Sequence, residues 1–159
     1  YLHAVRRGRK INNGRTFHWK MWLTHSSAPH TYSTPSAAAP HRHIAMPMHP
    51  QRLKERGFNQ ALEIARVLCA KQSHKLDCDS VERQTNRPAQ VSLAWQARLK
   101  NIKGVFKLQS ASRIIGQRIA ILDDVMTTGA SLNELAKTLK QAGASHVECW
   151  IVARTLARP

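Results

Sequence analysis

The chain has 159 residues, enough for one domain with a hydrophobic core and too few for two domains of ordinary size. Its hydrophobic share is 42% and its formal net charge is +16, from 25 Lys and Arg against 9 Asp and Glu. No apolar run approaches the roughly 20 residues of a transmembrane helix, and no stretch has the pattern of a secretory signal, so we expect no membrane insertion.

The positive charge bears on the class of partner, and the cysteines bear on the cellular compartment. A basic surface attracts nucleic acid and small polyphosphates alike, so charge alone does not separate these two kinds of partner. The three cysteines, Cys69, Cys78 and Cys149, are widely spaced and odd in number. They argue against a disulfide framework and favour the reducing cytoplasm.

Residues 1–43 show no sustained hydrophobic period, contain no acidic residue and hold six of the nine histidines. We therefore expect a disordered or non-native extension, with a short docked element around residues 19–23 as the alternative. The pair His41-x-His43 has a metal-ligand spacing but no partnering Cys or acid, so we predict no metal site there. A start at Tyr1 is compatible with a fragment or a shifted reading frame.

From Ile44 the pattern becomes that of a folded domain, which we expect to span residues 44–159. Residues 44–48 predict a short buried strand, the segment from Phe58 to Cys69 predicts a helix with one apolar face, and residues 76–84 predict a weaker strand. Residues 85–107 form a long polar excursion, a length that is typical of a lid or a binding loop.

The C-terminal third has the clearest pattern. Residues 118–122 predict a buried strand, Ser131-x-x-Glu134 predicts a capped helix start, and Gly143 predicts the end of that helix. Residues 146–153 predict a last strand. Strand, helix and strand in succession predict a parallel sheet with a right-handed crossover, and hence an α/β fold.

Residues 123–131 combine two carboxylates, a hydroxyl-rich turn and a helix start. They fall at the carboxyl end of the predicted strand, where ligands bind on such sheets. The N-terminus of a helix binds phosphate, and paired carboxylates suit sugar hydroxyls or a hydrated divalent cation. A phosphorylated sugar satisfies both requirements. The competing interpretation makes Asp123 and Asp124 turn formers and Ser131 only a helix cap.

The stretch from Ile119 to Ser131 resembles the signature with which type I phosphoribosyltransferases bind 5-phosphoribosyl 1-pyrophosphate (PRPP): an apolar strand, two acids, then Thr-Thr-Gly-x-Ser. Two further stretches resemble the ComF/GntX competence-protein family. One is Pro47-x-x-Pro50-x-Arg52 followed by Arg56-Gly57-Phe58-Asn59-Gln60; the other is Gln90-x-x-Leu93 followed by Arg98-x-x-Asn101 and Phe106. The match runs from about Ile44 to Thr155.

The resemblance implies a type I phosphoribosyltransferase-like, Rossmann-like parallel sheet with flanking helices. Members of the family typically carry a cysteine-rich, zinc-type segment before the first core strand. Residues 1–43 replace that segment here, so the amino-terminal part is atypical or truncated. Because this part usually helps to form the hood over the acceptor base, its loss would remove acceptor selection and leave the PRPP half.

The resemblance also implies roles for individual residues. Asp123 and Asp124 would accept hydrogen bonds from the ribose hydroxyls and from waters on Mg²⁺. The 5′-phosphate would be held by backbone N–H groups and hydroxyls of the turn that follows. The implied PRPP-binding residues are Asp123, Asp124, Val125, Met126, Thr127, Thr128, Gly129, Ala130 and Ser131. Arg52 and Arg56 are candidates for the pyrophosphate, since arginine forks match phosphate oxygens. The loop over the site would contain Gln90, Arg98 and Asn101.

The implied activity is Mg²⁺-dependent transfer of the phosphoribosyl group to a nitrogen nucleophile with release of pyrophosphate. The family name adds a connection with DNA uptake or utilisation in natural competence, with single-stranded DNA or competence-machinery proteins as partners. No general base is apparent, because Gly129 and Ala130 occupy the places directly after Thr128. The alternative is a non-catalytic PRPP- or nucleotide-sensing regulator or interaction module on the same fold. The acceptor stays open, and a homo-oligomer is compatible with the sequence.

Overall fold

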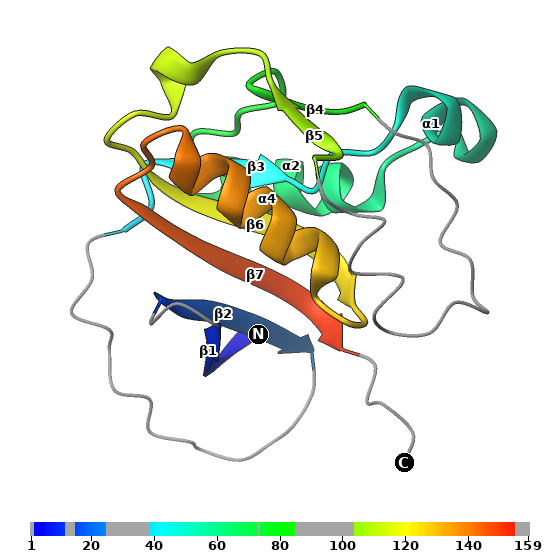
Figure 1. Cartoon of the computed structure of the whole chain (residues 1–159). Helices are drawn as coiled ribbons and strands as arrows, with labels where there is room; N and C mark the ends of the chain where they lie inside the picture. Colours follow the sequence, from blue (N-terminus) through cyan, green and yellow to red (C-terminus); the bar gives the residue numbers. More distant parts are fainter. Residues whose placement is uncertain (1, 12–14, 25–38, 73, 85–103, 155–159) are drawn as a thin grey trace.

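A five-stranded sheet organises the part of the chain that the computed structural model describes, residues 2–11, 15–24, 39–72, 74–84 and 104–154 (Figure 1). The strands are β1 (Leu2–Ile11), β2 (Arg15–Thr24), β3 (Arg42–Ala45), β6 (Arg118–Met126) and β7 (His146–Arg154), in the order β1-β2-β7-β6-β3. Strands β2, β7, β6 and β3 are parallel, and β1 is antiparallel to β2. The predicted α/β fold with a parallel sheet is confirmed.

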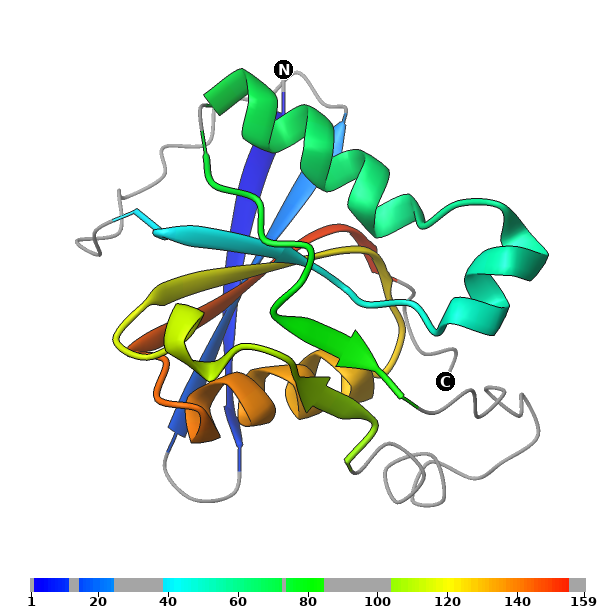
Figure 2. The ribbon, with the colours of Figure 1, turned by 90° about the horizontal axis from the view of Figure 1, so that it is seen from above.

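Helices cover both faces of the sheet (Figure 2). Helix α2 (Gln60–Gln72) packs against β3 and β6, and α4 (Ala130–Gln141) packs on the other face against β7. A separate two-stranded sheet of β4 (Val81–Arg83) and β5 (Phe106–Leu108) lies beside α4, followed by a short 3₁₀ helix (Ala111–Arg113). The seven-residue helix α1 (Pro50–Arg56) buries no residue. None of the described helices combines the length and the apolar content that crossing a bilayer requires.

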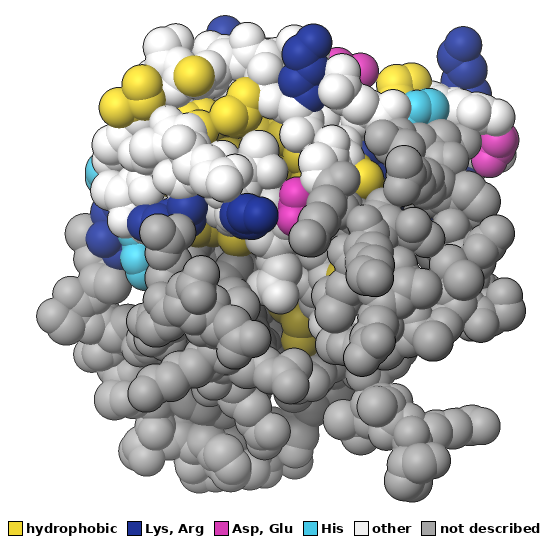
Figure 3. All heavy atoms as spheres, viewed as in Figure 1, with side chains coloured by type: hydrophobic (Ala, Val, Ile, Leu, Met, Phe, Trp, Pro, Cys, Tyr) yellow, Lys and Arg dark blue, Asp and Glu magenta, His cyan; other side chains and the backbone are white. Residues whose placement is uncertain are grey.

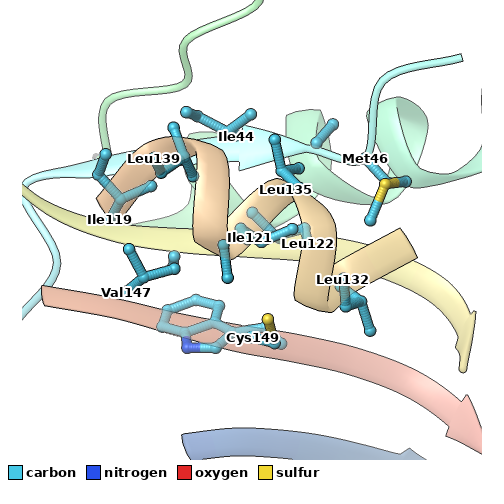
Figure 4. Packing of buried hydrophobic residues seen from close by; sticks show 14 of the residues in the cluster. Ile44, Met46, Ile119, Ile121, Leu122, Leu132, Leu135, Leu139, Val147 and Cys149 are labelled. Carbon is cyan, nitrogen blue, oxygen red and sulfur yellow. The ribbon is translucent and has the colours of Figure 1, made fainter. Parts of the chain in front are cut away.

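The core between α4 and the sheet fixes the position of the predicted site. Successive side chains of a strand point to opposite faces, so alternate residues of β6 and β7 face α4. The buried side chains that meet there come from β6, β7 and α4 (Figure 4). They are Ile119, Ile121, Val147, Cys149, Leu132, Leu135 and Leu139. Because these contacts hold β6 against α4, the turn that joins them is held at both ends.

The amino-terminal strands differ from the expectation of disorder in residues 1–43. The structure places β1 and β2 in a hairpin whose second strand pairs with β7, from His18 opposite Glu148 to Met21 opposite Ile151. Strand β3 also begins at Arg42, two residues before the expected boundary at Ile44. A pairing of this kind is made by backbone groups, and hydrophobic periodicity does not report it. The division of the chain into an extension and a domain at residue 43 stays a prediction.

Three other segment boundaries also differ from those predicted from the sequence. Strand β6 continues to Met126 rather than ending at Leu122, because Val125 and Met126 pair with Ala153 and Arg154. The weak strand expected at residues 76–84 is interrupted by a turn in which the Asp77 carboxylate accepts three hydrogen bonds from Asp79 and Ser80, and only residues 81–83 form β4. The polar excursion ends earlier than expected, since residues 106–108 form β5. The last strand and the helix end at Gly143, which has φ 94°, are as predicted.

Candidate functional site

Asp123 and Asp124 lie within the last part of β6 and are half-buried. The backbone N–H of Asp124 donates to Asp123 Oδ1 (3.0 Å), and that of Val125 donates to Asp124 Oδ1 (2.8 Å). The pKa of Asp123 is raised to about 7, mainly by burial and in addition by the adjacent Asp124 side chain, while the charge of Arg83 opposes the shift. Because both acids belong to a paired strand, the interpretation of them as turn formers is wrong.

The turn after β6 ends at Gly129, which is the N-cap residue of α4 and has φ 76°. The N-cap residue makes no side-chain hydrogen bond to the helix, and Ser131 lies inside its first turn, so the predicted capping box is wrong. Thr128 Oγ1 accepts a hydrogen bond from the Ala130 N–H (3.3 Å). Glu134, the expected partner of Ser131, instead accepts a hydrogen bond from the Gly104 N–H (2.7 Å). The N-terminus of α4 is therefore not closed by Ser131 or by Glu134.

One pocket, with a volume of about 250 Å³, brings the main predicted residues together at the carboxyl end of the sheet. It is lined by carboxylates from β6, the hydroxyl residue at the start of α4, and basic residues from α1 and β4. These are Asp123, Asp124, Ser131, Arg52, Arg56 and Arg83. Val125 also lines the pocket.

The other turn residues predicted to bind PRPP do not line this pocket. Met126 and Ala130 are buried, whereas Thr127 is exposed and Thr128 is half-buried. The resemblance assigned backbone N–H groups to this turn, and their role toward a phosphate stays a prediction. The predicted loop residues Gln90, Arg98 and Asn101 lie outside the described residues.

Arg83 is the residue of this pocket that the sequence analysis missed. It ends β4, is half-buried, and its guanidinium carbon lies 5.8 Å from the centre of the Phe106 ring on β5. Burial lowers the pKa of Arg83, the positive charge of Arg52 lowers it further, and Asp123 raises it. The signal in the sequence was a single arginine at the end of a weak strand, without a motif of its own.

The segment between β3 and α2 positions the two predicted arginines. Asn59 Nδ2 donates to the Met46 carbonyl (3.1 Å), and Asn59 Oδ1 accepts from the Leu62 N–H (3.4 Å). The Asn59 side chain therefore links the segment after β3 to the start of α2, and α1 lies between these two segments in the sequence. Arg52 and Arg56 on α1 are both exposed, and Arg56 Nη1 donates to Gln60 Oε1 (3.3 Å).

Chemically, the pocket combines an oxygen-rich end and a cationic end. Two adjacent carboxylates supply hydrogen-bond acceptors for hydroxyl groups, and three guanidinium groups supply donors for phosphate oxygens. No group of three or more His, Cys, Asp or Glu side chains with metal-binding geometry occurs in the described part of the chain. Two carboxylates fit a cation such as Mg²⁺ that keeps several waters and is shared with a phosphorylated ligand.

Comparisons with known proteins agree with this geometry. Residues 53–159 match the model of the phosphoribosyl transferase domain. The chain is 33% identical over 131 residues to the DNA utilization protein YhgH of Escherichia coli K12, covering 80% of this chain and 55% of that protein. It is 34% identical over 116 residues to competence protein F of Haemophilus influenzae, covering 70% of this chain and 49% of that protein.

A third relative is more distant. Competence protein ComFC of Streptococcus pneumoniae is 29% identical over 111 residues, covering 70% of this chain and 47% of that protein. The chain thus spans about half the length of the curated relatives that it matches.

Proposed function

The chain belongs to the ComF family of the phosphoribosyltransferase superfamily, and on that premise we propose that it binds PRPP, with Mg²⁺, in the pocket at the end of β6. The observation that carries the proposal is the shared pocket of the aspartate pair, Ser131 and the arginines. The ribose hydroxyls donate to Asp123 and Asp124, and the 5′-phosphate lies at the start of α4, whose N-cap residue is the glycine Gly129. The pyrophosphate lies toward the arginines.

The reaction that this arrangement serves is transfer of the phosphoribosyl group to a nitrogen nucleophile. The bond between ribose C1 and the pyrophosphate oxygen breaks, and its electron pair leaves with the pyrophosphate. The nitrogen lone pair forms the new bond to C1, and the proton released from nitrogen passes to water. We assign no side chain as the base, because Gly129 and Ala130 follow Thr128. Bound Mg²⁺ would neutralise charge on the pyrophosphate, while the arginines position that leaving group.

Binding of Mg²⁺ and PRPP is expected to raise the melting temperature of the chain, and Asp124→Asn is expected to remove most of that rise. The substitution removes a charged acceptor for a ribose hydroxyl, and a hydrogen bond to a charged group contributes about 1.5–3 kcal/mol. Thermal unfolding with and without Mg²⁺·PRPP measures the effect. Asp79→Asn, which removes an exposed carboxylate outside the pocket, is the matched control. An equal rise in wild type and Asp124→Asn would contradict the proposed site.

A second function, sensing of PRPP or a nucleotide without turnover, is favoured by the lack of an acid after Thr128. The two functions are separated by measuring pyrophosphate release from PRPP in the presence of a panel of nitrogen bases. Release that depends on one acceptor supports the transferase. Binding of PRPP with no release for any acceptor supports the sensor.

We propose that this site serves DNA uptake or utilisation in the cytoplasm, because relatives carry the names DNA utilization protein and competence protein. The net charge of +16 supports a single-stranded DNA partner. On the described part of the face seen in Figure 3, however, Lys and Arg side chains are dispersed among neutral and apolar ones. Binding by dispersed charges depends on salt and carries little sequence preference.

The affinity for a single-stranded oligonucleotide is therefore expected to fall steeply with salt, about tenfold or more between 50 and 200 mM for a few phosphate contacts. Fluorescence anisotropy with labelled oligonucleotides of two unrelated sequences measures it. A flat salt profile, or no binding at 50 mM salt, would exclude a charge-driven DNA interaction and leave competence proteins as the partner class.

A further inference from the structure

We propose that Arg83, rather than Arg52 or Arg56, is the principal arginine that holds the pyrophosphate group of the ligand. This inference rests on the proposed function, because it assigns one part of the same ligand to one residue of the same pocket. No motif in the sequence pointed to this residue. Its position, its burial and its charge environment support the assignment.

Arg83 occupies the boundary between two cavities. Its side chain lines the pocket of about 250 Å³ that contains Asp123 and Asp124, and it also lines an adjoining cavity of about 400 Å³ between β3, α2 and β4. On its other side the guanidinium carbon lies 5.8 Å from the ring centre of Phe106. Because Phe106 is directly opposite Arg83 in the β4–β5 pair, the backbone that presents this side chain is held by both strands.

Arg83 differs from the two arginines of α1 in how deeply it is buried. Arg83 is half-buried, whereas Arg52 and Arg56 are exposed on a helix that buries no residue. Attraction between opposite charges grows as water is excluded, and exposed ion pairs contribute little. An anion that enters the pocket therefore gains more from Arg83 than from either arginine of α1.

The charges around Arg83 also favour the binding of an anion to its guanidinium group. Among the described residues, no carboxylate lies within ion-pair distance of its guanidinium, and the nearby positive charge of Arg52 is unfavourable to it. A pyrophosphate group between these two guanidinium groups would satisfy both. The planar fork of an arginine matches two phosphate oxygens at once, which a lysine ammonium does not.

The test compares three ligands, each with Mg²⁺, on the full 159-residue chain: PRPP, inorganic pyrophosphate and ribose 5-phosphate. Calorimetry gives the dissociation constants for wild type, Arg83→Gln, Arg83→Lys and the double variant Arg52→Gln/Arg56→Gln. We expect Arg83→Gln to weaken PRPP and pyrophosphate binding about tenfold or more, and to change ribose 5-phosphate binding less than about twofold. The affinity of Arg83→Lys for PRPP and pyrophosphate is expected to lie between those of wild type and Arg83→Gln. The double variant is expected to lose less affinity than Arg83→Gln.

The possible results distinguish a failure of this inference from a failure of the proposed function. If wild type binds PRPP and Arg83→Gln binds it equally well, or if the double variant loses more, this inference is overturned and the proposed function stands. If Arg83→Gln weakens ribose 5-phosphate as much as PRPP, Arg83 supports the pocket as a whole and the inference is again overturned. If wild type binds none of the three ligands, the proposed function fails and the inference with it. Melting temperatures without ligand monitor folding, and Arg83→Lys supplies the comparison if Arg83→Gln does not fold.

Discussion

Gly129→Ala is expected to abolish most of the rise in melting temperature that Mg²⁺·PRPP produces. Gly129 has φ 76°, a left-handed conformation that costs a residue with a Cβ about 1–2 kcal/mol. The added Cβ would meet the Met126 side chain at ordinary contact distances, 3.5 Å to Sδ and 3.9 Å to Cγ, so the effect comes from the backbone and not from a clash. Relief of the strain rotates the peptide groups of the turn and withdraws their N–H groups from the phosphate. Loss of one or two charge-assisted hydrogen bonds lowers the affinity about 10- to 100-fold.

Gly116→Ala is the matched control for this backbone effect. Gly116 has φ 71°, no atom within 4 Å of the added Cβ, and a position just before β6, at the opposite end of that strand from the site. Both variants are expected to melt a few degrees below wild type without ligand. Only Gly129→Ala is expected to lose the response to Mg²⁺·PRPP. A retained response in Gly129→Ala would show that the turn does not hold the phosphate.

The succession of β6, α4 and β7 was predictable because each element has a local pattern. The apolar run before Asp123, the apolar face of the helix and the glycine at its end all lie within a few residues of the element that they define. The pairing of the acids with a helix start was predictable for the same reason. Local patterns therefore suffice to predict that Asp123, Asp124 and Ser131 share one pocket, as they do.

The features that were missed depend on partners distant in the sequence. Strand β6 continues past the acids because its last residues pair with Ala153 and Arg154, about 28 positions later. Arg83 faces the site because β4 pairs with β5 across the segment 85–103. Glu134 binds Gly104 rather than the helix start. None of these contacts leaves a periodic signal in the sequence, so a propensity argument finds the elements but not their long-range pairing.

The aspartate pair has a second expected consequence, on stability as a function of pH. The pKa of Asp123 is raised from 3.8 to about 7 by burial and by its neighbour Asp124. The folded chain therefore binds this proton more tightly than the unfolded chain does. Between about pH 4 and pH 7 the group destabilises the fold progressively as pH rises, and above pH 7 the full penalty is present. At about 1.4 kcal/mol per pKa unit, the penalty reaches at most about 4 kcal/mol.

Asp123→Asn is therefore expected to be more stable than wild type at pH 8, with a difference that shrinks toward zero as pH falls to about 4. Urea unfolding at several pH values measures this difference, and Asp79→Asn corrects for the removal of one negative charge from the chain. Asp124→Asn should show a smaller gain of the same sign, because it removes one cause of the raised pKa and leaves the burial of Asp123 in place. A pH-independent difference between Asp123→Asn and wild type would mean that Asp123 is ionised in the folded chain without cost. In that case the ligand-free site would receive a cation or a ribose hydroxyl without releasing a proton. If the pKa of Asp123 is raised, binding of a cation below pH 7 must instead be accompanied by release of the Asp123 proton.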